Sequence, residues 1–366
     1  MTGKLVLENL KNRPMRTLLS VLLIGVPVTL ILTLVGLSHG MLEDAQHRAR
    51  AVGADIFVRP PGSSFLTASG AMPDGILGAL EKLPHVKLAV GVVNQPVQGV
   101  TLGIAGIDLK QFDIISGGFR LLAGTTFQGP DDVMIDEFYA SEKGLKPGGR
   151  VSLLNHDWRV CGIFEGGKLA HIVAPISRVQ QLTGNVGKIS QAYVKLDNPA
   201  NTASMVQHLK SDPMWSNYPV YSVQEFTALY SINNIPGLRQ FVGVVIGIGV
   251  VIGFAVVCLS MYMAVLQRTR EIGILKALGA SNGFILRVIV AEALLMGVGG
   301  TVLGIIMSYG AWWLIRTLVP ASIQMVIVHS WWPIALGITL AGTGFGALYP
   351  GISAARHDVI EALAYE

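Results

Sequence analysis

The sequence has 366 residues, of which 51% are hydrophobic and only 14% are charged, and its mean hydropathy is +0.53. This composition excludes an ordinary soluble enzyme, even one with a large core. The formal net charge of +4 arises near the apolar segments, because Lys and Arg equal Asp and Glu in number over residues 40–240. The charge therefore indicates membrane topology and not a nucleic-acid surface.

Four segments are long enough to cross a bilayer as helices, which takes about 20 apolar residues. They are predicted at 17–39, 241–266, 288–315 and 331–355. A cleaved signal peptide is the alternative for the first segment. Its apolar run exceeds the roughly 7 to 15 residues of such peptides, and no small-residue cleavage site follows it. We therefore expect a retained anchor.

Basic residues near the spans indicate the orientation of the chain in the membrane. They gather in residues 1–17 and 267–287, whereas the link 316–330 contains only Arg316 and lies between two tryptophan pairs. We expect both termini and the 267–287 loop in the cytoplasm, and residues 40–240 outside it.

The segment 40–240 has the pattern of a folded α+β domain, because β-rich runs alternate with turn residues and two helical stretches. Strands are predicted at 54–60, 132–136 and 191–197, a hairpin over 149–164, helices over 175–184 and 201–212, and a mobile loop at 60–70. Cys161 in this domain cannot pair with Cys258 in the second span, so no disulfide framework is implied. The predicted fold is an α-helical membrane protein with four transmembrane helices and an α+β extracytoplasmic domain inserted between helices 1 and 2.

The motif search finds one match to enzyme chemistry, "GASNG" at 279–283, which has the G-x-S-x-G pattern of a serine nucleophile elbow. Such a serine needs a strand before it and a nearby histidine, whereas a helix-forming stretch precedes Ser281. We expect Gly279 to end one helix and Ser281 or Asn282 to begin the next. Neither a phosphate-binding loop nor an H-E-x-x-H metal motif occurs, so any ATP must be bound by another chain.

Small residues four apart in the spans favour close helix packing, within the bundle or at a dimer face, and the second span carries two such pairs. These pairs are Gly243 and Gly247, Gly249 and Gly253, and Gly300 and Gly304. Glu292 is an acid within the third span, where its carboxyl group can have either a structural or a functional role. His39, Met41 and His47 near the outer end of the first span are weak candidates for metal or haem ligands.

Three stretches carry a family resemblance: "ENLKNRPMRTLLSVLLIG" entering the first span, "LQRTREIGILKALGAS" after the second, and "YPGISAARHDVIEALAYE" at the C-terminus. With the order of one span, a large outer domain and three further spans, the chain resembles the permease subunits of type VII ABC transporters, the MacB/FtsX/LolC type. The size of the outer domain suits the DevC-like or haem-exporter-like branch.

The resemblance implies a bacterial inner-membrane homodimer that binds a separate cytoplasmic ABC ATPase, and it leaves room for a membrane-fusion adaptor. Closure of the ATPase on ATP and Mg would move the outer domains, a process called mechanotransmission, and this chain itself would bind no cofactor. The segment 267–280 would be the coupling helix. Arg268, Arg270 and Glu271 would make polar contacts with the ATPase, and the apolar residues at 272, 275 and 278 would fill a groove on it. The implied coupling residues are Arg268, Arg270, Glu271, Ile272, Gly273, Leu275, Lys276, Leu278 and Gly279.

The predicted organisation follows from these segments. It comprises a cytoplasmic amphipathic helix 1–16, span 17–39, the extracytoplasmic domain 40–240, span 241–266, the coupling helix and turn 267–287, span 288–315, an outer link 316–330, span 331–355 and a cytoplasmic tail 356–366. An exported or extracted amphipathic substrate is expected. Two alternatives remain: a non-transporting regulator of an extracytoplasmic partner such as a cell-wall hydrolase, and a membrane hydrolase that uses Ser281.

Overall fold

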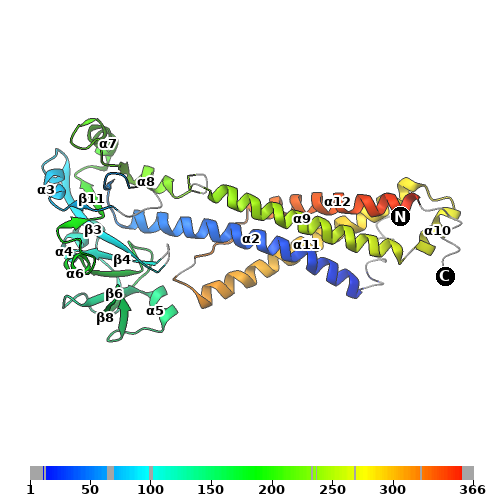
Figure 1. Ribbon diagram of the computed structural model, residues 1–366, viewed down its shortest axis with the longest axis horizontal. Helices are drawn as coiled ribbons and strands as arrows, with labels where there is room; N and C mark the ends of the chain where they lie inside the picture. Colours follow the sequence, from blue (N-terminus) through cyan, green and yellow to red (C-terminus); the bar gives the residue numbers. More distant parts are fainter. Residues whose placement is uncertain are drawn as a thin grey trace. The chain divides into compact units, whose positions relative to one another are not determined.

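The computed structural model describes residues 11, 14–63, 70–98, 102–231, 234–235, 237–267, 269–321 and 324–356 (Figure 1). Most of the predicted segments 1–16 and 356–366, together with Arg268 and residues 64–69, lie outside the described residues. The chain divides into two compact units. We call Met1–His39, Gly237–Leu314 and Met325–Glu366 the helical unit, and Gly40–Pro236 with Ile315–Gln324 the α+β unit.

Four of the described helices are long and apolar enough to cross a membrane. They are α2 (Pro14–Ala51), α9 (Leu238–Leu266), α11 (Asn282–Leu318) and α12 (Trp331–Arg356), and the short α10 (Thr269–Ala277) lies between α9 and α11 in sequence. The first span is predicted to end at residue 39, but the helix continues to Ala51. Its last turns are polar and helix-forming, and Gly53, with φ +78°, follows its end.

The helices of the helical unit approach one another closely at small residues. The Ser20 and Ser260 hydroxyls are 2.6 Å apart between α2 and α9. Thr29 of α2 donates to the carbonyl of Gly304 in α11 at 3.2 Å. On α12, a Cβ added at Gly346 would lie 3.0 Å from the carbonyl oxygen of Phe254 in α9. These contacts fix neighbouring backbones against one another, as small residues do in membrane bundles.

The α+β unit is built on a mixed sheet in the order β12-β1-β11-β3-β4-β9-β6-β8-β5, with β7 paired to β8. Neighbouring strands are antiparallel except for the parallel pairs β4–β9 and β6–β8. The strands are β1 (Ile56–Val58), β3 (Val86–Gln98), β4 (Leu102–Ile107), β5 (Leu121–Gly124), β6 (Asp132–Asp136), β7 (Arg150–Leu153), β8 (His156–Phe164), β9 (Ile172–Pro175), β11 (Gln191–Leu196) and β12 (Val220–Ser222). A separate pair is formed by β2 (Met72–Pro73) and β10 (Lys188–Ile189).

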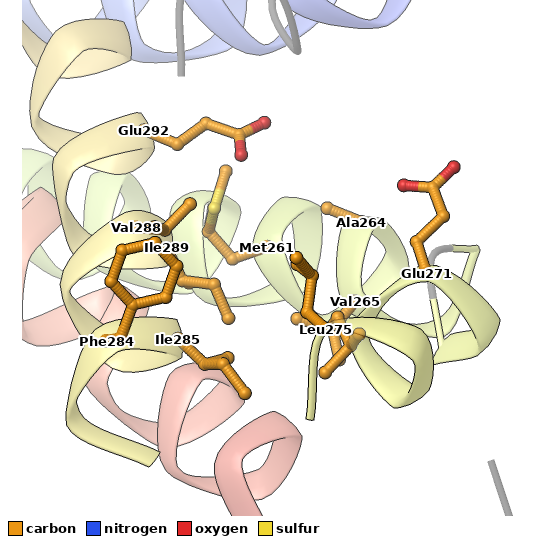
Figure 2. A pocket seen from close by; sticks show the side chains of 11 residues that line it. Met261, Ala264, Val265, Glu271, Leu275, Phe284, Ile285, Val288, Ile289 and Glu292 are labelled. Atoms are coloured by element: carbon orange, nitrogen blue, oxygen red, sulfur yellow. The ribbon is translucent and has the colours of Figure 1, made fainter. Parts of the chain in front are cut away.

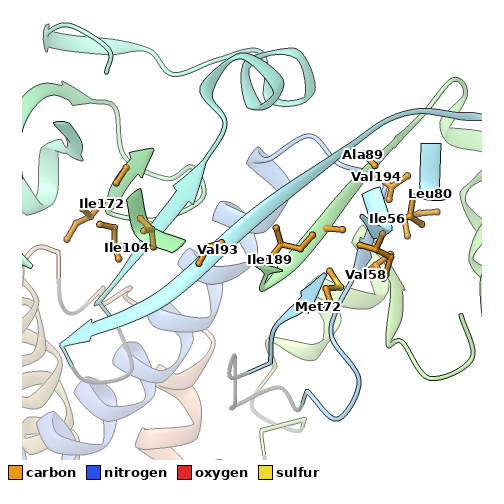
Figure 3. Close-up of a cluster of buried hydrophobic side chains, with 14 of the residues drawn as sticks. Ile56, Val58, Met72, Leu80, Ala89, Val93, Ile104, Ile172, Ile189 and Val194 are labelled. Atoms are coloured by element: carbon orange, nitrogen blue, oxygen red, sulfur yellow. The ribbon is translucent and has the colours of Figure 1, made fainter. Parts of the chain in front are cut away.

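Both faces of this sheet are covered, because alternate residues of one strand enter different apolar clusters. On β6, Val133 and Ile135 enter the first cluster, which includes side chains of α3, α5, α6 and α7. Figure 3 shows part of this cluster, with Leu80 of α3 and the strand residues Ile56 and Ile104 among those labelled. Met134 enters the second cluster, with side chains of α4, α8 and the residues just after α2. The helices are α3 (Ile76–Glu81), α4 (Leu109–Ser116), α5 (Glu137–Lys143), α6 (Ile176–Leu182), a 3-10 turn η1 (Pro199–Asn201), α7 (Thr202–Ser211) and α8 (Val223–Leu229).

These elements confirm the predicted strands, the hairpin β7–β8 and both predicted helices of the α+β unit. The predicted link 316–330 contributes residues to this unit as well as connecting two spans. Residues 315–324, which include the first part of the link, belong to the α+β unit. The backbone N–H of Ala321 donates to Glu142 at 3.1 Å, and the Ala321 side chain is buried in the first cluster.

Candidate coupling site

The helix α10 is defined at both ends by hydrogen bonds that its sequence encodes. At its start, the Thr269 hydroxyl donates to the carbonyl of Leu266 at 2.9 Å, which satisfies an acceptor at the end of α9. At its end, Gly279 has φ +93°, and the N–H of Ala280 donates to Leu275 while that of Gly279 donates to Lys276. These two bonds form a Schellman motif, a common helix stop.

Ser281 begins the next helix and does not form a nucleophile elbow. Its hydroxyl accepts the backbone N–H of Phe284 at 3.2 Å, which makes Ser281 the N-cap of α11. The residue follows a helix and not a strand. The predicted stop at Gly279 and start at Ser281 or Asn282 are both confirmed.

One side of α10 faces its own chain. A cavity of about 80 Å³ lies between α9, α10 and α11, and Ile272 and Leu275 line it from α10. Figure 2 shows Leu275 beside Val265 of α9. Ile272 also packs against the apolar cluster of the helical unit, and Gly273 is buried. The remaining lining residues are Met261, Ala264, Val265, Glu271, Phe284, Ile285, Val288, Ile289 and Glu292.

The opposite side of α10 is open in the described chain. Leu278 is 81% exposed and Ile274 is 47% exposed, and Arg270 lies one turn before Ile274. We call Arg270, Ile274 and Leu278 the outward face of α10. Of the three residues predicted to fill a groove on the ATPase, Leu278 is exposed, whereas Ile272 and Leu275 are half-buried beside α9 and α11. Of the other predicted coupling residues, Glu271 and Gly279 are exposed and Lys276 is half-buried.

The glycines predicted to bring helices together behave in two ways. A Cβ added at Gly300 would lie 2.7 Å from Cβ of Ile24, and one at Gly304 would lie 2.7 Å from Cβ of Val28, so α11 approaches α2 at both. On α9, a Cβ at Gly249 would make ordinary contact with Ile31 at 3.4 Å. At Gly243, Gly247 and Gly253 it would meet no described atom within 4 Å. Among the predicted glycine pairs, the pair in the third span therefore lies at a close helix contact within the described chain, and the pairs in the second span do not.

Sequence reasoning missed the partners of these contacts. The carbonyl of Gly25 lies 3.0 Å from the added Cβ of Gly304, and Gly297 and Gly346 also sit against neighbouring helices. Such positions depend on which helix lies opposite, and no local pattern in the chain encodes that. Glu292 is 4% exposed and lies at the end of the cavity opposite Glu271 (Figure 2).

Other candidates for chemistry lie in the α+β unit or near the end of the first span. His39 and His47 each place Nδ1 near a backbone carbonyl oxygen, of Val35 at 3.0 Å and of Gly167 at 3.3 Å. Within the described ranges, no group of three His, Cys, Asp or Glu side chains is arranged to hold a metal. Burial raises the pKa of Cys161 to about 11, which makes that thiol a poor nucleophile.

Comparison with known families gives two matches that together cover most of the chain. Residues 17–212 match the MacB-like periplasmic core domain, and residues 243–359 match the FtsX-like permease C-terminal domain. The first match alone covers more than half of the 366 residues.

The chain is also similar to ABC transporter permeases and to macrolide export proteins. The chain is 34% identical over 154 residues to the uncharacterized ABC transporter permease YknZ of Bacillus subtilis, covering 41% of this chain and 37% of YknZ. It is 26% identical over 413 residues to the macrolide export ATP-binding/permease protein MacB of Sodalis glossinidius, covering 99% of this chain. The Escherichia coli MacB is 24% identical over 396 residues, again covering 99%. The chain spans 60% of the length of each of these two MacB proteins.

Two solved structures are also similar. The extracellular domain of YknZ matches with TM-score 0.36 and 16% identity, covering 46% of this chain and 99% of that domain. The periplasmic region of MacB from Actinobacillus actinomycetemcomitans matches with TM-score 0.37 and 18% identity, covering 51% of this chain and 97% of that region. On the family matches, the chain belongs to the FtsX-like ABC transporter permeases that carry a MacB-like periplasmic core domain.

Proposed function

We propose that this chain is the permease subunit of a bacterial inner-membrane ABC transporter and couples ATP hydrolysis on a separate cytoplasmic ATPase to motion of the α+β unit. The ATPase would bind ATP and Mg. The α+β unit would lie outside the cytoplasm and both termini inside it, as the basic residues near the spans favour. An amphipathic molecule would be exported or extracted by this motion.

The observation that carries the proposal is the outward face of α10. A short helix is held between two apolar spans by the Schellman motif and by the Ser281 cap, and Leu278 projects from it with 81% of its surface exposed. Covering a leucine side chain stabilises a complex by about 1.5–3 kcal/mol. Arg270 on the same face adds a charged group with fixed donor geometry for a carboxylate on the partner.

The helix α9 supports the proposal of a homodimer. In the most apolar 18-residue stretch of α9, only 11% is buried within the described chain, whereas the corresponding share in the other three spans is 33% to 44%. Gly243, Gly247 and Gly253 lie on this span with open space around them. A second copy packed against these glycines would allow close backbone approach. An adaptor protein outside the membrane is compatible with this arrangement.

The test is Leu278→Asp in the tagged full-length chain, purified from membranes of its own cells with mass spectrometry of the proteins that accompany it. We expect the ABC ATPase present with the unaltered chain to be lost, because a charge replaces the exposed apolar group. Ile114→Asp is the matched control, since Ile114 is 68% exposed in the α+β unit and lies far from α10 in the sequence. That variant should keep the ATPase.

Leu275→Asp is not equivalent to Leu278→Asp, because Leu275 lines the cavity within the chain. A charge there disturbs the packing of α10 itself. If Leu278→Asp retains the ATPase in the same amount as Ile114→Asp, the outward face of α10 is not the docking surface and the proposal loses its support.

A further inference from the structure

The last turns of α2 are held by three consecutive side chains that reach three separate segments of the α+β unit. Gln46 donates to the carbonyl of Tyr230 at 2.6 Å, just after α8. His47 Nδ1 lies 3.3 Å from the carbonyl oxygen of Gly167, in the loop before β9. Arg48 reaches Asp136. Because consecutive helical residues point about 100° apart, the helix end is held from three directions.

Arg48 is the buried member of this set and has charged partners. It is 7% exposed, its Nε lies 2.7 Å from Asp44 Oδ2, and its Nη2 lies 3.4 Å from Asp136 Oδ2. His171 Nδ1 lies 2.7 Å from the same Asp136 oxygen. A carboxylate oxygen accepts hydrogen bonds, so Asp136 Oδ2 is the acceptor for both Arg48 Nη2 and His171 Nδ1. Arg48 Nη2 also lies 3.2 Å from His171 Nδ1, which brings the three side chains into one cluster.

Asp136 connects this cluster to the middle of the sheet. It is the last residue of β6 and is fully buried. Its Oδ1 accepts the N–H of Tyr139 at 2.9 Å and caps α5. Its own N–H donates to the carbonyl of His171, directly before β9, at 2.9 Å. Arg48 therefore links α2 to two neighbouring strands and one helix.

The chemistry of this link is directional. Well-packed apolar groups stabilise a fold as well as a buried ion pair does, but they lack hydrogen bonds of defined direction. A guanidinium donates in a fixed plane, and one residue along a helix corresponds to about 1.5 Å of rise and about 100° of rotation. The Arg48 bonds therefore define both the rotation and the axial position of the end of α2 against the sheet.

We propose that Arg48, Asp136 and His171 form the joint through which α2 drives the α+β unit, with Arg48 as its positioning residue. The inference rests on the proposed function, because it assigns the joint a part in ATP-driven motion. α2 is a single helix from Pro14 to Ala51. A displacement of its apolar span thus reaches Arg48 along the helix and passes to β6 and β9 through Asp136 and His171.

The first experiment tests the joint without the ATPase. Hydrogen exchange is measured on the full-length chain in nanodiscs for the peptide that covers the last turns of α2. Arg48→Met keeps the length and apolar stem of the side chain and removes its charge. Because this change leaves Asp136 buried with one partner fewer, the double variant Arg48→Met/Asp136→Asn is measured in parallel, since asparagine retains the cap of α5.

We expect exchange in the last turns of α2 to rise at least tenfold in both variants, as for amides that gain a local opening. Strands β3 and β11 should keep the exchange rates of the unaltered chain. Arg120→Met is the matched control, because Arg120 pairs with Glu165 at 3.4 Å on the exposed surface of the same unit. If hydrogen exchange in the last turns of α2 is unchanged in either variant, the proposed joint is wrong.

The second experiment uses the complex with its ATPase. We expect Arg48→Met/Asp136→Asn to keep ATP hydrolysis while the change in exchange of the α+β unit on adding Mg-ATP disappears. A merely structural role would leave that ATP-driven change in place, and such a result overturns the inference. If the unaltered complex shows no ATP-driven change, the proposed function fails, and the role of the joint in transmission fails with it.

Discussion

The contact of α11 with α2 at Gly300 allows a quantitative prediction for Gly300→Ala. The added Cβ would lie 2.7 Å from Cβ of Ile24 and 3.3 Å from the carbonyl oxygen of Val21. Cβ of Ile24 is fixed to its backbone, so the two helices must separate. Forcing extra atoms into a packed contact costs about 1–3 kcal/mol, whereas replacing a helical glycine with alanine recovers about 0.5–1 kcal/mol. We expect a net loss of up to ~2.5 kcal/mol.

Gly310→Ala in the same helix isolates the packing effect, because a Cβ there meets no described atom within 4 Å. The gain in helix propensity is common to both variants, so the difference between them is the packing cost of about 1–3 kcal/mol. The assay is thermal unfolding in detergent, followed by circular dichroism at a helical wavelength. If Gly300→Ala melts at or above the temperature of Gly310→Ala, the close approach of α11 to α2 is not present in the protein.

Two further predictions concern single side chains. Ser281→Ala should leave ATPase co-purification unchanged. It should lower the free energy of unfolding by about 1 kcal/mol through the lost N-cap, as measured by thermal unfolding. Loss of a hydrolytic activity in this variant would instead support the alternative of a membrane hydrolase that uses Ser281. Burial raises the pKa of Cys161 to about 11, so at pH 8 its thiol stays protonated and, in a Cys258→Ala chain, it should react with a maleimide about a hundredfold more slowly than after denaturation. The rate should rise as the pH approaches 11, and fast labelling of the folded chain at pH 8 would contradict the burial.

The sequence predicts the four spans and the α+β unit because both depend on local patterns. Long apolar runs mark the helices, and the strands of the sheet alternate or run apolar between turn residues. The end of α10 is equally local, since Gly279 supplies the left-handed conformation and Ser281 the next cap. These features require no knowledge of which segments meet in space.

The features of the structure that the sequence does not predict depend on contacts between segments far apart in the chain. Residues 315–324 join the α+β unit through Ala321 and Glu142, which lie far apart in the sequence. The spacing of Ile272, Leu275 and Leu278 suggests one apolar face, but α9 and α11 decide which side of α10 is covered. The second span carries more glycine pairs, yet Gly300 and Gly304 make the close contacts, because Ile24 and Val28 lie opposite them.

The proposed route of transmission can be interrupted at three separate places. The outward face of α10 would receive the ATPase, α10 packs on α11 around the cavity, α11 meets α2 at Gly300, and α2 ends at Arg48 on the strands. Proximity alone does not demonstrate coupling, but the three places differ in kind. A change at Leu278 acts on partner binding, one at Gly300 on helix packing, and one at Arg48 on a directional ionic link. If the route works, the variants must therefore differ in the step that they remove. The Leu278 variant should lose ATPase binding, whereas the Arg48 variant should keep ATP hydrolysis and lose the motion of the α+β unit.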